Sequence, residues 1–293
     1  MRAKSSSLYL FSAFGIPVLV HWTWFCFPFA PLLFVGRGMG GWVGVGVAFG
    51  ILCLIVGCLL AHELAHCLVA RGFGCGTKRI LLIPFGMVGD LERIPREPAQ
   101  EILVAAAGPV TSACLAGLAW AASLSAKWFD PPIAFHVEGL CLLLAFFNVM
   151  AAAFNLLVAI LPSDGGRILR ATLFAALRRW TRMGERRSHL LATKIAVRCV
   201  GWPLAVLLIG VMIKTGFMVP HLFILLPLLG AAGELELWAL RECPEIFDVP
   251  DTVRFLPAVQ RLPARRSASR PPPHSLWALE IVLSSEQGAR WVT

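Results

Sequence analysis

Five consecutive residues, His62-Glu63-Leu64-Ala65-His66, carry the side chains best suited to chemistry in this sequence. Residues four apart on a helix are turned by only about 40° relative to each other, so the two histidines share one face. The glutamate lies beside that pair. The H-E-x-x-H arrangement is typical of sites in which two imidazoles bind zinc and the glutamate is general base for a water molecule. The motif therefore predicts one Zn²⁺ ion on His62 and His66, with Glu63 as catalytic base.

The motif follows an uncharged run from Val43 to Leu60, which is long enough for a membrane-spanning helix. Apolar residues make up 58% of the chain and charged residues 15%, and the mean hydropathy is +0.75. Soluble domains lie nearer half apolar and a quarter charged. The composition predicts an integral membrane protein. An ionisable cluster at the end of such a helix is costly, and it marks a candidate functional site.

Six segments are long and apolar enough, or nearly so, to cross a bilayer core of about 30 Å as helices. They cover residues 17–35, 42–70, 101–126, 138–161, 193–213 and 217–240. Between the second and third, Lys78–Pro95 is too short to span, and its glycines and prolines favour strands. We expect an all-α polytopic membrane protein with six transmembrane helices and a short β-hairpin or re-entrant strand segment after the second helix. That segment either walls a cleft beside the motif or is an interfacial hairpin without a substrate role.

The basic residues are distributed asymmetrically over these predicted spans. With the N-terminus on the cytoplasmic side, all but three of the 26 Lys and Arg residues fall in inner segments, the exceptions being Arg37, Lys127 and Lys214. This positive-inside bias predicts cytoplasmic N- and C-termini and places the motif near the cytoplasmic face. It also accounts for the net charge of +9 without a nucleic-acid partner. The lipid bilayer is the expected partner.

Composition divides the chain into three expected parts. Residues 1–16 form an N-terminal cytoplasmic segment, residues 17–241 a six-helix core, and residues 242–293 a Pro/Arg-rich cytoplasmic tail. The tail composition is typical of a partly disordered extension. The nine cysteines are scattered mostly through apolar spans and favour reduced, buried side chains over a disulfide framework.

A catalytic zinc usually takes three protein ligands, so the two histidines need a third. Asp164 stands out, because Pro162 and two following glycines break the helix at the cytoplasmic end of the fourth predicted span. His136 falls on the opposite side of the membrane. Three further candidates stay open at this point, namely Asp90, Glu92 and His189.

Several motifs occur in order along the chain. They are Gly15-Ile16-Pro17-Val18 followed by His21, the H-E-x-x-H motif, Gly108-Pro109-Val110-Thr111-Ser112, Phe154-Asn155-Leu156-Leu157 running to Asp164-Gly165-Gly166-Arg167, and Gly230-Ala231-Ala232-Gly233-Glu234. Over about residues 10–241, this series resembles the site-2 protease family of intramembrane zinc metalloproteases. The resemblance implies a zinc-dependent endopeptidase that hydrolyses a peptide bond in or near the transmembrane segment of a single-pass membrane protein. It also implies a multi-pass protein of a bacterial or archaeal cell membrane.

The resemblance further implies that His62, His66 and Asp164 hold the zinc, with Glu63 as base. It suggests that Asn155 lies near the scissile bond and stabilises the oxyanion.

The motif around Asn155 departs from the family pattern in two ways. Val158 stands where the family usually has proline, and one extra residue separates Asn155 from the aspartate. An extra residue turns the asparagine by roughly 100° on a helix. Asn148, two turns earlier, is therefore an alternative to Asn155.

Two other functions fit parts of the pattern. A catalytically inactive protease-like scaffold could bind membrane clients, and the departure at Asn155 keeps this reading open. A metal-ion transporter suits six spans with intramembrane histidines, but it has no use for Glu63 and usually shows related halves.

Many relatives carry a nucleotide-sensing module after the last helix. The short Pro/Arg-rich tail argues against such nucleotide regulation, and no feature indicates an oligomeric state.

Overall fold

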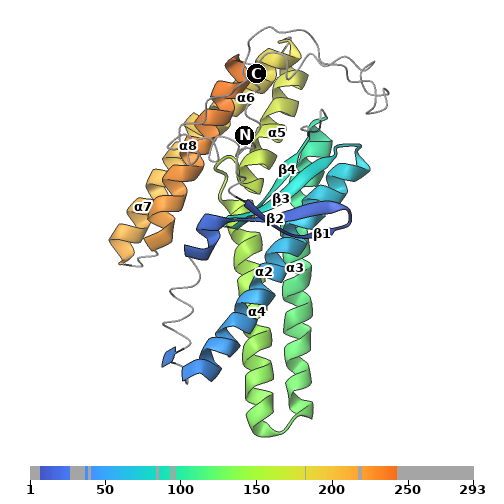
Figure 1. Ribbon diagram of the computed structural model, residues 1–293. Coiled ribbons are helices and arrows are strands. Elements are labelled where there is room, and N and C mark those ends of the chain that lie inside the picture. Colours follow the sequence, from blue (N-terminus) through green and yellow to red (C-terminus); the bar gives the residue numbers. More distant parts are fainter. Residues whose placement is uncertain are drawn as a thin grey trace, which may run out of the picture. The chain divides into compact units, whose positions relative to one another are not determined.

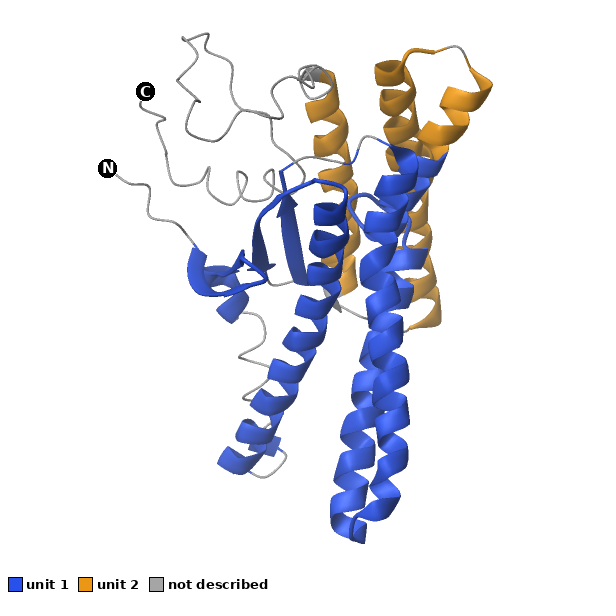
Figure 2. Cartoon of the chain, turned by 90° about the vertical axis from the view of Figure 1, so that its right-hand side faces the viewer, with its two compact units in different colours: residues 1–172 blue, residues 173–293 orange. Residues whose placement is uncertain are grey.

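The computed structural model describes residues 7–26, 37–38, 41–83, 86–92, 95, 97–181, 183–216 and 220–242. The chain divides into two compact units, residues 1–172 and 173–293 (Figure 2). The first unit combines a small sheet with three long helices, and the second is helical in its described part. Helix α5 (Asp164–Trp180) begins in the first unit and continues into the second.

The sheet has four strands in the order β1-β2-β3-β4, with bounds Ser7–Ala13, Ile16–His21, Thr77–Ile83 and Gly86–Leu91. Strands β1 and β2 form an antiparallel hairpin, and β3 and β4 form another. The two hairpins join through a parallel pairing that aligns Val18 with Ile80 and Val20 with Leu82. Parallel neighbours need a long crossover, and here that connection contains helix α2 (Gly41–Gly72).

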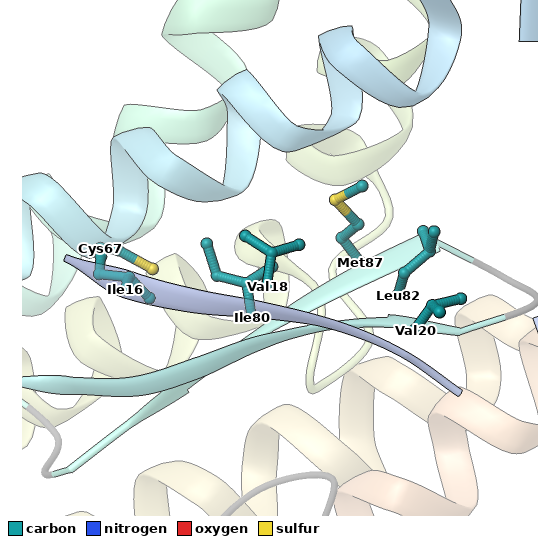
Figure 3. Close-up of a cluster of buried hydrophobic side chains, with 7 residues drawn as sticks. All are labelled: Ile16, Val18, Val20, Cys67, Ile80, Leu82 and Met87. Atoms are coloured by element: carbon teal, nitrogen blue, oxygen red, sulfur yellow. The ribbon is translucent and has the colours of Figure 1, made fainter. Parts of the chain in front are cut away.

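A hydrophobic cluster fixes α2 on one face of this sheet. Its buried members come from alternate positions of the strands and from the helix, as Figure 3 shows: Ile16, Val18, Val20, Ile80, Leu82, Met87 and Cys67. The alternation follows from the two-residue period of a strand, which sends every second side chain to the same face. Leu60 and Leu64 of α2 pack against the cluster. The sheet therefore packs against the end of α2 that carries the H-E-x-x-H motif and holds this end in place.

Two further helices complete the first unit. Helix α3 (Pro98–Ser123) continues into the 3₁₀ turn η2 (Leu124–Trp128), and α4 (Pro131–Leu157) returns beside it (Figure 1). A short turn then leads to α5. In the second unit, α6 (Glu185–Lys194), the π-helical segment η3 (Ile195–Gly201) and α7 (Trp202–Thr215) form one continuous helix, followed by α8 (Pro220–Glu242).

Five helices among the described residues are long and apolar enough to cross a membrane. They run over Gly41–Gly72, Pro98–Trp128, Pro131–Leu157, Glu185–Thr215 and Leu222–Arg241. Large apolar side chains on the outer part of α2, such as Trp42 and Val43, are exposed, as expected for a lipid-facing surface. The protein is an integral, multi-pass membrane protein.

The predicted first span, residues 17–35, is wrong over its described part. Ile16–His21 is strand β2 and Trp22–Cys26 is the 3₁₀ turn η1, while residues 27–35 lie outside the described residues. The alternating burial of Ile16, Val18 and Val20 gives the physical reason. Their apolar character reflects packing under a helix, whereas the prediction took it as contact with lipid. The described residues thus contain five membrane-length helices, where six were expected.

The all-α expectation is also corrected. Residues 77–91 do form paired strands, but those strands are half of a four-stranded sheet that the N-terminal hairpin completes. The predicted tail from residue 243 onward lies outside the described residues.

Candidate metal centre

Helix α2 brings its two histidines together on one buried face. His62 is 4% exposed and His66 is 5% exposed, and their ring centroids lie 4.9 Å apart. One donor atom each from His62, Glu63 and His66 lies within 4.8 Å of the others. The spacing of four residues along the helix produces this pairing, as the sequence predicted.

Asp164, the predicted third ligand, meets both histidines. Its Oδ2 lies 3.2 Å from Nε2 of His62 and 3.3 Å from Nε2 of His66. In a tetrahedral zinc site with bonds of roughly 2.0–2.1 Å, neighbouring ligand atoms are about 3.3 Å apart. Oδ2 of Asp164 therefore lies at the spacing of neighbouring zinc ligands from each of the two imidazole nitrogens.

The turn between α4 and α5 places Asp164 by close backbone packing. A Cβ on Gly165 would overlap the backbone of Leu156, and one on Gly166 would overlap the backbone at Ile160 and Leu161. Ser163 donates a hydrogen bond to the carbonyl of Val158, and its Oγ accepts one from the amide of Gly166. The two glycines thus let the start of α5 lie directly on the end of α4.

The outer nitrogen of each histidine has a partner on α3. Nδ1 of His66 lies 2.6 Å from the carbonyl oxygen of Val104, and Nδ1 of His62 lies 2.9 Å from Oγ of Ser112. A carbonyl can only accept, so Nδ1–H of His66 donates, and the neutral ring then keeps an unprotonated Nε2. That tautomer is the one that binds metal through Nε2.

Gly108 of α3 provides the space in front of these nitrogens. A Cβ at this position would overlap the Nε2 atoms of both histidines. Nε2 of His66 is buried and makes no hydrogen bond, although Asp164 is nearby. Three observations fit a single Zn²⁺ ion. Gly108 leaves space in front of the histidines, Nε2 of His66 is buried without a hydrogen bond, and the donors are two imidazoles and one carboxylate.

Glu63 points from α2 towards strand β4. Its Oε2 accepts a hydrogen bond of 3.1 Å from the amide of Gly89. A side chain at Gly89 would be crowded, because its Cβ would lie 3.0 Å from Sγ of Cys67 and 3.4 Å from that Oε2. The strand therefore approaches the carboxylate closely and fixes its direction beside the three candidate ligands.

Electrostatics keep Asp164 in its ligating form. Burial disfavours the charged carboxylate, but the interactions with the imidazoles of His66 and His62 outweigh it and hold the pKa of Asp164 below its usual range. Asp164 lies outside the five membrane-length helices. It is therefore ionised at neutral pH and ready to accept a cation.

The two asparagine candidates hydrogen-bond within their own helix. The amide nitrogen of Asn155 donates to the carbonyl of Ala151 at 3.0 Å, and that of Asn148 donates to Leu144 at 2.8 Å. Asn148 is buried, and its Oδ1 makes no hydrogen bond. The oxyanion role given to Asn155, and the alternative at Asn148, stay predictions.

The other candidates for the third ligand have different surroundings. Asp90 lies 3.6 Å from Arg79 in an ion pair on the sheet, and the Glu92 carboxylate lies beside Gly76. The ring of His136 packs edge-on to Phe135. His189 belongs to the second unit and packs against Phe174. Asp164 alone among the five has described contacts with both motif histidines.

Sequence reasoning named Gly108 and Ser112 as part of a motif, but it assigned α3 no contact with the histidines. Glu101, Val104, Gly108 and Ser112 are spaced three or four residues apart, which puts them on one helix face. All four are buried. This spacing was visible in the sequence, and it would have identified a face that packs against the histidines.

The fold and the site together define a class: a polytopic membrane protein with a zinc centre of the metallopeptidase type. The model of peptidase family M50 matches residues 50–139. A zinc metalloprotease of Methanocaldococcus jannaschii is 32% identical over 206 residues, which is 69% of this chain and 53% of that protein. The solved site-2 protease from Methanocaldococcus jannaschii superposes with a TM-score of 0.51 at 28% identity, covering 78% of this chain and 94% of that one.

The chain belongs to the site-2 protease family, peptidase family M50. It spans about half the length of the curated relatives it matches.

Proposed function

We propose that this protein is a zinc-dependent intramembrane endopeptidase, which hydrolyses a peptide bond in or near the transmembrane segment of a single-pass membrane protein. The convergence of His62, His66 and Asp164 beside Glu63, at one end of a membrane-length helix, carries the proposal. The names of the relatives, as zinc metalloprotease and site-2 protease, support it.

The residues of the site divide the chemistry between them. When bound, zinc polarises the attacked carbonyl and lowers the pKa of water towards neutrality. Glu63 accepts the proton of the attacking water and returns it to the leaving amine. The amide of Gly89 uses one acceptor site of Oε2 and fixes the direction of the Glu63 carboxylate, whose remaining acceptor sites can take that proton. The Val104 carbonyl and Ser112 hold the histidines in place.

Strand β4 offers a way to present the substrate. It is an edge of the described sheet, and its residue Gly89 contacts Glu63. Exposed strand edges pair readily with extended peptides. A substrate helix that unwinds can therefore pair along β4 and bring a peptide bond to the carboxylate. Asn155, or Asn148 in its place, would then support the oxyanion.

A comparison of wild type with Glu63→Gln tests the catalytic proposal. Both proteins are reconstituted into liposomes with a single-pass model substrate, and cleavage is followed by mass spectrometry. We expect Glu63→Gln to lose about 10²- to 10⁴-fold in rate, because the general base is removed. Its metal content should stay near one zinc per chain, since Glu63 is not a ligand.

The same experiment separates the alternatives. His66→Ala serves as a metal-free control and should lose both zinc and cleavage. Equal cleavage by wild type and Glu63→Gln would contradict the proposed mechanism. Binding of the model substrate with zinc present but without cleavage in either protein would instead identify a protease-like scaffold. Zinc flux across the liposome membrane would identify a transporter.

A further inference from the structure

A buried ion pair joins two elements of the first unit. Arg170 of α5 donates to Glu101 of α3, and the two side chains are 1% and 2% exposed as residues. Both are among the largest fully or nearly fully buried side chains in the described chain. Neither residue lies among the candidate metal ligands, and the chemistry proposed above uses neither.

Each partner of this pair lies on an element that supplies the metal centre. Glu101 is one turn before Val104, whose carbonyl holds His66, and it shares a face with Gly108. Arg170 follows Asp164 by six residues, or about 9 Å along the axis of α5. The pair therefore ties the helix that carries the third ligand to the helix that orients the histidines.

Stability alone is a weak explanation for such a pair. The desolvation of two charges offsets most of their attraction, and well-packed apolar residues often stabilise a fold as well. A buried pair does demand one geometry, because any shift leaves a charge without its partner. For α5 this requirement fixes both the rotation and the height of the helix against α3.

We propose that Glu101 and Arg170 are positioning residues that hold Asp164 at ligand distance from His62 and His66, and so set the metal affinity of the site. The proposal rests on the metal site of the proposed function. It predicts that the pair acts on metal binding through the position of α5, with no contact to substrate.

The test uses the full-length protein in detergent, stripped of metal. Zinc affinity is measured by chelator competition, and the visible spectrum of the Co²⁺ form reports coordination geometry. The double variant Glu101→Leu/Arg170→Met removes the pair but keeps apolar volume. We expect its zinc Kd to rise about 10- to 100-fold, the range found when a residue that orients a metal ligand is lost. Its Co²⁺ spectrum should lose intensity typical of tetrahedral sites.

A matched control comes from the second unit. Arg198 and Glu234 form an ion pair at 2.8 Å, and that unit supplies none of the three residues His62, His66 and Asp164. Arg198→Met/Glu234→Leu should keep the zinc Kd and the Co²⁺ spectrum of wild type. Arg170→Lys retains the charge with a shorter reach, so it should give an affinity between wild type and the double variant.

The outcomes are separable. A double variant that folds, as judged by circular dichroism and melting temperature, and binds zinc like wild type would overturn the positioning role. If the double variant does not fold, Arg170→Lys decides: a folded protein with wild-type affinity and spectrum overturns the proposal, and weakened binding supports it. A wild-type protein that binds no zinc overturns the proposed function and, with it, this inference. Zinc binding by wild type without cleavage removes only the proposed function.

Discussion

At the scale of single residues, hydrogen bonds to α3 determine which histidine nitrogens face the metal. Val104 offers a carbonyl, which can only accept, so its bond at 2.6 Å dictates the tautomer of His66. Ser112 offers a hydroxyl, which can donate or accept. When a metal ion binds Nε2 of His62, the proton of the neutral ring is on Nδ1, and Nδ1 then donates to the Ser112 hydroxyl. Without metal, the hydrogen bond can run in either direction. The two histidines thus differ in how strongly the protein prepares them before metal binds.

Ser112→Ala tests this difference. Without the hydroxyl, His62 loses the partner that orients its ring, and we expect a zinc affinity about 10- to 100-fold weaker than wild type. Competition with a chromophoric chelator measures the change. Ser123→Ala is the control, because Ser123 is a buried serine of the same helix whose Oγ donates to the carbonyl of Trp120. Equal zinc affinity in Ser112→Ala and wild type would contradict the orienting role.

The candidate site residues were the most predictable part of the molecule. His62, Glu63 and His66 are close in sequence, so helix periodicity alone places them together. Asp164 lies 98 residues after His66, yet helix-breaking neighbours marked its position. Backbone partners such as the carbonyl of Val104 and the amide of Gly89 carry no residue-type signal, because every residue has these groups. Only the folded structure shows them.

At the scale of elements, α2, which carries the H-E-x-x-H motif, packs with its histidines against α3. The buried face of α3 is the one that meets them. This face runs through Glu101, Val104, Gly108 and Ser112, and three of these contact or make room for the histidines. A glycine at the closest point allows the helices to approach without an intervening side chain. On other faces of the same helix, Val110 and Leu118 are exposed, as expected for side chains that face lipid.

Gly108→Ala should abolish metal binding while leaving a folded protein. The added methyl group would overlap both Nε2 atoms, so the histidines must turn away or the helices separate. Zinc content after purification and the Co²⁺ spectrum measure the loss. Gly117→Ala is the matched control, since a Cβ at that position meets nothing within 4 Å. It should bind zinc normally and gain roughly 0.5–1 kcal/mol in helix stability.

The strand β2 shows why one element escaped prediction. Its sequence, Ile16-Pro17-Val18-Leu19-Val20-His21, is as apolar as a membrane helix. Both faces of a strand in a covered sheet can be apolar, so hydropathy does not separate it from a span. Its partner β3 is about 60 residues away in sequence, beyond the whole of α2. A pairing of that separation leaves no local pattern, whereas β3 and β4 adjoin and were recognisable as strands.

At the scale of the whole molecule, the basic residues predict an orientation for the first unit. Gly72 ends α2 beside the motif, and Lys127 lies in the turn that joins α3 to α4 at the other end of these helices (Figure 1). The positive-inside bias assigns the Gly72 end to the cytoplasm and the Lys127 end to the outside.

Thiol labelling with a membrane-impermeant reagent tests this orientation. In a background lacking the nine native cysteines, Lys127→Cys should react in intact cells and Gly72→Cys only after the membrane is opened. Both positions are exposed, so reactivity reports the side of the membrane. Reaction of Gly72→Cys in intact cells would reverse the predicted topology.

The depth of the metal centre in the membrane predicts where a substrate is cut. His62 follows Gly41 by 21 residues, or about 32 Å along α2, which is close to the thickness of a hydrocarbon core of about 30 Å. The lipid-facing apolar surface begins at Trp42, so the histidines fall near the predicted cytoplasmic boundary. We therefore expect single-pass substrates to be cut within roughly two turns of the cytoplasmic end of their membrane segment.

Mass spectrometry of the cleavage products measures this position directly. Three leucines inserted at the outer end of a model substrate's membrane segment should leave the cut site unchanged. The same insertion at its cytoplasmic end should move the cut by about three residues, because the enzyme's site stays at a fixed depth. Glu63→Gln provides the background for each substrate. Cleavage that follows one sequence regardless of the insertions, or that falls at the bilayer centre, would contradict a site fixed at the membrane boundary.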